Sequence, residues 1–100
     1  MEKRAFERIS ASLEFHCFNI DYYGTVKNLS EKGMLIKSQK INFPLELQFY
    51  MSITLREEIV NVPVEVRRIT KSNGYYDSIG VEILEQPQKY LKLINRLRVA

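Results

Sequence analysis

The segment from residue 45 to residue 56 limits the possible folds of this chain more than any other. Its apolar and polar residues alternate without a break. Apolar residues occupy the odd positions (Leu45, Leu47, Phe49, Met51, Ile53, Leu55) and other residues the even ones (Glu46, Gln48, Tyr50, Ser52, Thr54, Arg56). A strand places alternate side chains on opposite faces, whereas a helix would scatter these apolar residues around its circumference. The pattern therefore predicts a β-strand with one buried face.

Similar patterns predict further short strands. Alternation covers residues 10–18, and strands are also expected at residues 25–29 and 34–37. Four valines at even positions repeat the pattern (Val60, Val62, Val64, Val66), with Pro63 acceptable at an edge or a bulge. The turn signal Asn73-Gly74 then precedes a last alternating segment (Ile79, Val81, Ile83).

The end of the chain has a helical pattern, predicted over residues 87–98. Pro87 suits a first helical turn, and an apolar stripe follows (Tyr90, Leu91, Ile94, Leu97). The opposite face is polar (Lys89, Lys92, Asn95, Arg96). About six short strands and one amphipathic helix predict a mainly β protein, a small antiparallel six-stranded β-barrel with the helix on its mouth or side. We expect the barrel to span residues 10–85.

The length of 100 residues predicts a single domain, 1–100, without room for a separate catalytic domain. No apolar run approaches the roughly 20 residues that span a bilayer, and no signal peptide is visible. With Cys17 as the sole cysteine, an internal disulfide is impossible, so we expect a cytoplasmic location. The net charge of +3 favours an anionic partner only weakly.

The residues needed for catalysis are scarce. The sole histidine, His16, is adjacent to Cys17 in a predicted strand, so their side chains should point to opposite faces. That arrangement argues against a Cys-His nucleophile pair and against a shared metal ion. No phosphate-binding loop of the P-loop type and no dinucleotide fingerprint is present. We therefore expect neither an enzyme nor a metal site.

Two short motifs near the start of the chain suggest a function. They are Arg4-Ala-Phe-Glu-Arg8 and Asn28-Leu-Ser30-Glu-Lys-Gly33. In order and spacing the pair resembles the RxxxR and (D/N)xSxxG motifs of the PilZ family, which binds the bacterial second messenger cyclic di-GMP. The resemblance covers nearly the whole chain, and Gly80 in Ser-Ile-Gly-Val resembles a late strand of that family. We count Gly80 as evidence for the fold and not as a ligand contact.

The resemblance implies a ligand-binding role for five residues. Arg4 and Arg8 would hold phosphate and one guanine, while Asn28, Ser30 and Gly33 would face the other guanine. The chemistry is suitable, because an arginine fork matches a phosphate or the O6/N7 edge of guanine, and arginine also stacks on bases. Asn28 and Ser30 offer short hydrogen-bonding groups, and Gly33 is expected to allow a positive φ and close approach of the ligand.

Simpler interpretations exist for each motif alone. Arg4 and Arg8 could form the solvated face of a short helix, paired with Glu7. Asn28 and Ser30 could build a turn with Gly33 at its left-handed position. Asn28 stands where aspartate is commoner in the family, a change that its pattern allows. Lys3 precedes the first arginine and leaves open whether one ligand or a stacked pair binds.

We therefore expect a stand-alone PilZ-like domain that binds cyclic di-GMP without other cofactors and signals to an unidentified downstream protein. The resemblance suggests a motility, adhesion or polysaccharide-export component. Residues 1–9, with Phe6 as their main apolar anchor, would form a ligand-binding arm that orders on binding. Two alternatives remain. One is a β-barrel that binds single-stranded nucleic acid through its aromatic residues, and the other is a protein-binding adaptor that does not bind nucleotide.

Overall fold

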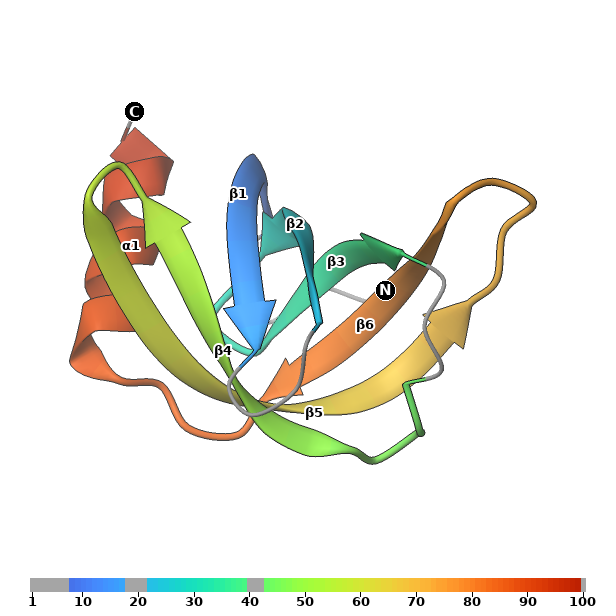
Figure 1. The fold of residues 1–100 in the computed structure, drawn as a ribbon. Helices are drawn as coiled ribbons and strands as arrows, with labels where there is room; N and C mark the ends of the chain where they lie inside the picture. The colour runs from blue at the N-terminus through green and yellow to red at the C-terminus, as the bar shows by residue number, and fades with distance from the viewer. Residues whose placement is uncertain (1–7, 18–21, 40–42, 100) are drawn as a thin grey trace, which may run out of the picture.

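The computed structural model describes residues 8–17, 22–39 and 43–99. These residues form six strands and one helix (Figure 1). In chain order they are β1 (Ile9–Cys17), β2 (Tyr23–Leu29), β3 (Gly33–Gln39), β4 (Gln48–Leu55), β5 (Glu58–Thr70), β6 (Tyr76–Ile83) and α1 (Gln88–Val99). All strand pairs are antiparallel, and the strands close into a barrel in the order β1-β2-β3-β6-β5-β4. The predicted fold is confirmed.

Strand β1 closes the barrel, because it pairs with β2 on one side and with β4 on the other. Phe15 in its middle lies opposite Gly24 of β2 and Ile53 of β4. Irregularities in register interrupt the β1–β2, β2–β3 and β5–β6 pairs. Such bulges bend strands and increase their twist, as closure of a small barrel requires.

The alternating segment of residues 45–56 is a strand only from Gln48 to Leu55. There Phe49, Met51 and Ile53 point into the core, as predicted. The predicted start is wrong, because Leu45 and Glu46 form a turn and Leu45 is 61% exposed. Glu46 has a φ of 67°, a left-handed conformation that breaks the alternation of an extended chain.

Pro63 lies within β5 opposite Tyr50 of β4. Its carbonyl oxygen accepts a hydrogen bond from the backbone N–H of Leu84, one residue beyond the end of β6. The N–H that proline lacks would also point toward β6, and the β5–β6 pairing ends at this position. Pro63 therefore lies at a local edge of the sheet, as expected, because β6 ends beside it.

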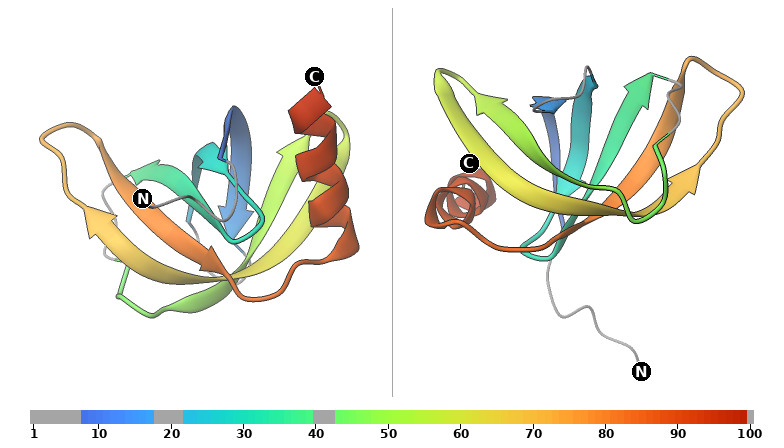
Figure 2. Two further views of the ribbon diagram at one scale, coloured as in Figure 1. Left: turned by 180° about the vertical axis from the view of Figure 1, so that it is seen from behind. Right: turned by 60° about the horizontal axis from the view of Figure 1, so that its bottom comes forward.

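Helix α1 lies against the barrel beside β1 and β5, whereas the β5–β6 hairpin extends away from it (Figures 1 and 2). Tyr90, Leu93 and Ile94 are fully buried. Leu91 and Leu97, both predicted for the apolar stripe, are only half-buried. At about 100° per residue, Leu91 and Leu93 lie on opposite sides of the stripe that runs through Tyr90 and Ile94, and the barrel covers the Leu93 side. The prediction therefore missed Leu93.

Candidate functional site

The second motif forms the tight connection between β2 and β3. Ser30 follows the last residue of β2, and Gly33 is the first residue of β3. The Ser30 hydroxyl oxygen accepts hydrogen bonds from the backbone N–H groups of Lys32, at 3.2 Å, and of Gly33, at 3.3 Å. The Ser30 N–H donates to the Gly33 carbonyl oxygen at 2.8 Å. Ser30 is buried and builds this turn, as one of the two interpretations of the motif anticipated.

Three donors, one from the last residue of β6 and two from the chain after it, hold this turn in place. They bind its three successive carbonyl oxygens. The pairs are Tyr90 Oη to Ser30 O at 2.6 Å, Gln86 Nε2 to Glu31 O at 2.9 Å, and Ile83 N to Lys32 O at 2.8 Å. Burial raises the pKa of the Tyr90 phenol well above its usual range, so this phenol remains a proton donor at neutral pH. Helix α1 is thereby attached directly to the second motif.

Gly33 does not have the positive φ that we expected, and no glycine in the described ranges has one. It has ordinary strand geometry and pairs with Glu82 of β6. A Cβ atom at this position would lie 2.8 Å from the carbonyl oxygen of Val81. The close approach of β6 therefore requires glycine here, and the expected left-handed conformation is wrong.

Arg8 and Asn28 meet although 20 residues separate them in sequence. Arg8 directly precedes β1, where Ser10 pairs with Asn28 of β2. The Nη1 atom of Arg8 donates a hydrogen bond of 2.8 Å to Oδ1 of Asn28. Its Nη2 atom lies 3.9 Å from the position that a Cβ on Gly33 would occupy. Because the Asn28 amide is neutral, it orients the guanidinium without cancelling its charge.

The structure therefore brings together four of the five predicted site residues: Arg8, Asn28, Ser30 and Gly33. They line one groove with a volume of about 720 Å³. Arg4 lies outside the described residues. Ile9, expected in the arm, is instead the first residue of β1 and pairs with Leu29.

The groove extends from this motif across β3, β6 and β5. Its other lining residues are Lys32, Met34, Leu35, Arg67, Arg68, Thr70, Ser78, Gly80, Val81 and Glu82. Four of the described lining residues are basic (Arg8, Lys32, Arg67, Arg68) and one is acidic, Glu82, which forms an ion pair with Arg67 and leaves the other three positive charges in excess. This balance favours an anionic ligand. None of the described lining residues is aromatic, so this part of the groove lacks the stacking platform typical of single-strand binders.

Sequence reasoning missed the β5 and β6 side of the groove. Gly80 was assigned to the fold alone, and Arg68, Thr70 and Ser78 were not considered. A usable signal existed in β6, where the small residues Ser78 and Gly80 alternate with the core residues Ile79 and Val81. Two small residues on an outward face leave a depression between neighbouring strands.

A second groove of about 560 Å³ lies elsewhere on the barrel surface. Its lining includes Tyr23 and Tyr76, which are about half exposed, together with Lys27 and Lys37. Two further exposed tyrosines, Tyr50 and Tyr75, line neither groove. Phe49 is buried as predicted, and Phe15 is buried as well. Of the four exposed tyrosines in the described part of the chain, two therefore line the second groove and none lines the first.

His16 and Cys17 have the predicted opposite orientations, because His16 is exposed and Cys17 is buried. Burial raises the pKa of the Cys17 thiol to about 12, so the thiol is protonated at neutral pH. Among residues 8–17, 22–39 and 43–99, no three His, Cys, Asp or Glu side chains come together in a way that could hold a metal ion. No helix in the same part of the chain is long and apolar enough to cross a membrane.

Comparisons with known proteins identify one family. A model of the PilZ domain matches residues 2–99. A search of curated protein sequences found no match. The chain is similar in fold to the Bacillus subtilis Inhibitor of motility (MotI/DgrA), with a TM-score of 0.79 and 18% identity over 99% of this chain and 52% of that one. This chain thus spans about half the length of the Bacillus protein.

It is also similar in fold to the PilZ domain with c-di-GMP of YcgR from Escherichia coli. The TM-score is 0.77 and the identity 12%, over 96% of this chain and 88% of that one. At these identities the two neighbours show the fold that the described residues adopt.

Proposed function

This chain belongs to the PilZ domain family, and on that premise we propose that it is a receptor domain for cyclic di-GMP rather than an enzyme. The observation that carries the proposal is the meeting of Arg8, Asn28 and Gly33, from two motifs 20 residues apart, at the end of a basic groove. The presence of c-di-GMP with the similar YcgR domain supports the same ligand class here.

The groove offers the contacts that such a ligand needs. Cyclic di-GMP carries two phosphate charges and two guanines. Arg8 uses Nη1 to bind Asn28, so its Nη2 and Nε atoms can bind a phosphate or the O6/N7 edge of a guanine. Asn28 accepts from Arg8 through its oxygen, which leaves its NH₂ group to donate to a base. We propose that Arg4, at the other end of the first motif, supplies a second guanidinium group for bidentate hydrogen bonds to the ligand.

We assign Ser30 mainly a positioning role. Its hydroxyl oxygen accepts two backbone N–H groups of its own turn, and its carbonyl oxygen is held by Tyr90. Gly33 allows β3 to lie close to β6 and allows the Arg8 guanidinium to lie above it. Contacts within the protein thus hold the turn, and we propose that the ligand meets this prepared surface.

We propose that binding orders the arm before Arg8 and that the ordered arm presents a new surface to a downstream protein. The Arg8–Asn28 hydrogen bond and the pairing of Ile9 with Leu29 support this order of events, because they provide a fixed point from which the arm can fold onto the ligand. The proposal predicts that amide exchange of residues 3–7 slows when cyclic di-GMP is added. Equal protection with and without ligand would contradict it.

Calorimetric titration with cyclic di-GMP tests the receptor function. We expect the unchanged chain to bind, and we expect Arg8→Ala to lose about 1.5–3 kcal/mol of binding free energy, roughly tenfold or more in affinity. The thermal midpoint should hardly change, because Arg8 is exposed. A short single-stranded oligonucleotide serves as the competing ligand. Binding of the oligonucleotide in preference to cyclic di-GMP would favour the nucleic-acid alternative, and binding of neither would favour an adaptor.

A further inference from the structure

Strand β5 contains a bulge next to the groove. Val66 pairs with Val81 of β6, but the next paired residue is Arg68, which lies opposite Gly80. Arg67 is therefore the extra residue of the bulge. Both Arg67 and Arg68 are exposed, although consecutive residues of a regular strand point to opposite faces. The bulge thus places two arginines on the outer surface of the barrel.

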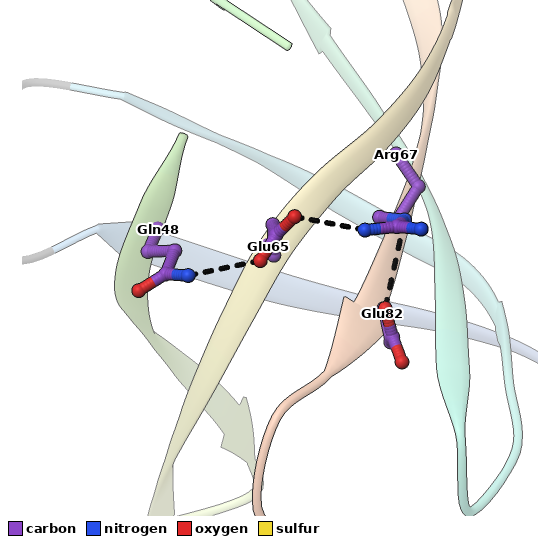
Figure 3. A network of polar contacts seen from close by, with 4 residues as sticks. All are labelled: Gln48, Glu65, Arg67 and Glu82. Atoms are coloured by element: carbon purple, nitrogen blue, oxygen red, sulfur yellow. Dashed lines mark hydrogen bonds and ion pairs between the residues drawn. The ribbon is translucent and has the colours of Figure 1, made fainter. Parts of the chain in front are cut away.

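The guanidinium of Arg67 is held by two carboxylates (Figure 3). Its Nη1 atom lies 2.9 Å from Oε2 of Glu65, and its Nε atom lies 3.5 Å from Oε1 of Glu82. Gln48 holds the other oxygen of Glu65 through a hydrogen bond of 2.9 Å. The hydrogen bonds from Gln48 and Arg67 lower the pKa of Glu65, so this carboxylate stays charged beside Arg67. The charge of Arg67 is thereby compensated within the protein.

Arg68 differs from Arg67 in this respect. Among the described residues, no hydrogen bond or ion pair engages its guanidinium. It lies on the β5 side of the groove, and Arg8 lies on the side formed by the β2–β3 turn. An uncompensated arginine at each side is an arrangement that suits a ligand with two separate negative charges.

The floor between the two sides leaves the Arg68 side chain accessible. Leu35 of β3, Gly80 of β6 and Arg68 of β5 lie side by side across the sheet. A Cβ on Gly80 would lie 3.7 Å from the Cβ of Arg68, an ordinary contact, so the packing of the protein does not require glycine there. The missing side chain instead leaves room beside Arg68. The hydroxyl groups of Thr70 and Ser78 line the groove one row further along.

We propose that Arg68 is a further ligand-binding residue, which binds one phosphate of the cyclic dinucleotide while Arg8 and Asn28 hold the opposite part of the ligand. The proposal rests on the proposed function. In this proposal the β5 bulge is needed because it orients the Arg68 side chain outward, into the groove. Arg67 serves a structural purpose, since its ion pair with Glu82 links β5 to β6 while Glu65 of its own strand holds the guanidinium.

The neighbouring arginines provide a matched pair of variants. Arg68→Ala and Arg67→Ala remove the same charge from adjacent positions of the same bulge. Titration of cyclic di-GMP should show at least a tenfold loss of affinity for Arg68→Ala and no more than a twofold loss for Arg67→Ala. Binding of phosphate by Arg68 should also appear in the salt dependence, which should be weaker in Arg68→Ala than in the unchanged chain.

The outcomes separate this proposal from the receptor function. Equal losses for the two variants would mean that only the net charge matters and would overturn the role of Arg68. Loss of affinity in Arg68→Ala with unchanged salt dependence would overturn the phosphate contact. If the unchanged chain binds and Arg8→Ala weakens binding but Arg68→Ala does not, the assignment of Arg68 fails alone. If the unchanged chain does not bind, the receptor function fails and the assignment fails with it.

Discussion

Gly33 and Gly80 both line the groove, but a side chain would meet different neighbours at the two positions. A Cβ on Gly33 would lie 2.8 Å from a backbone oxygen of β6, whereas one on Gly80 would make only an ordinary contact at 3.7 Å. Gly33→Ala should therefore force β3 and β6 apart and lower the free energy of unfolding by about 1–3 kcal/mol. Gly80→Ala should change it by less than about 1 kcal/mol. Urea denaturation of both variants measures the difference.

Equal urea midpoints for the two variants would contradict this account, because β3 would then accommodate a side chain at no cost. Gly80→Ala also serves as the control for substitution of glycine in a strand. A Gly33→Ala variant that keeps the parental stability but binds less cyclic di-GMP would mean that glycine is needed for ligand approach rather than for strand packing.

The groove residues near the β2–β3 turn could be predicted from the sequence, whereas those on β5 and β6 could not. Arg8, Asn28 and Gly33 occur in short motifs whose spacing is visible in one dimension. Arg68 reaches the groove because a bulge shifts the register of β5 against β6, and no alternation pattern reveals that shift. The reason for Gly33 was also misjudged, because its neighbour Val81 is 48 positions away in the sequence.

Helix α1 is the element whose packing most affects stability. Leu93 and Ile94 are fully buried, whereas Leu91 is half-buried. Leu93→Asp or Ile94→Asp would place an unpaired carboxylate in the core, which costs several kcal/mol, a large share of the stability of a small domain. Leu91→Asp should cost clearly less, because its carboxylate can reach water. Thermal unfolding followed by circular dichroism compares the three variants.

Two outcomes would count against this packing of α1. Parental melting of Leu93→Asp and Ile94→Asp would mean that the helix is not docked through these residues. Equal destabilisation by all three substitutions would mean that the apolar stripe is wider than its burial indicates. Lys92→Asp, a charge change on the exposed face, provides the control, and its melting temperature should stay close to that of the parent.

The elements themselves were largely predictable, because strands and helices have different hydrophobic periods. Their boundaries were less so. The alternation of residues 45–56 continues into a turn, where the positive φ of Glu46 ends the regular geometry before the pattern ends. The predicted hairpin at Asn73-Gly74 is found, with a loop over residues 71–75, and β6 begins at Tyr76, three residues before the predicted alternating segment. Local backbone conformation, rather than polarity, sets these ends.

At the scale of the whole molecule, the groove is a product of barrel topology. Strands β3 and β6 pair although β4 and β5 lie between them in the sequence, and β1 pairs with β4 to close the barrel. The hydrophobic pattern of one sequence predicts the strands but not which distant strands pair. The surface formed by β3, β6 and β5 therefore could not be predicted from it. The hydrogen bonds from Ile83, Gln86 and Tyr90 then connect the end of β6, the segment after it and helix α1 to the β2–β3 turn.

The most direct test of the central claim is an NMR titration that locates cyclic di-GMP on this protein. We expect the largest shifts of backbone amide resonances at Asn28, in the β2–β3 turn, in the β5 bulge and at Ser78 and Gly80. The second groove provides an internal control, because the amides of Glu14, Tyr23 and Lys37 should shift little. Saturating shifts around the first groove would support the account. Shifts confined to the second groove, or none at millimolar ligand, would contradict it.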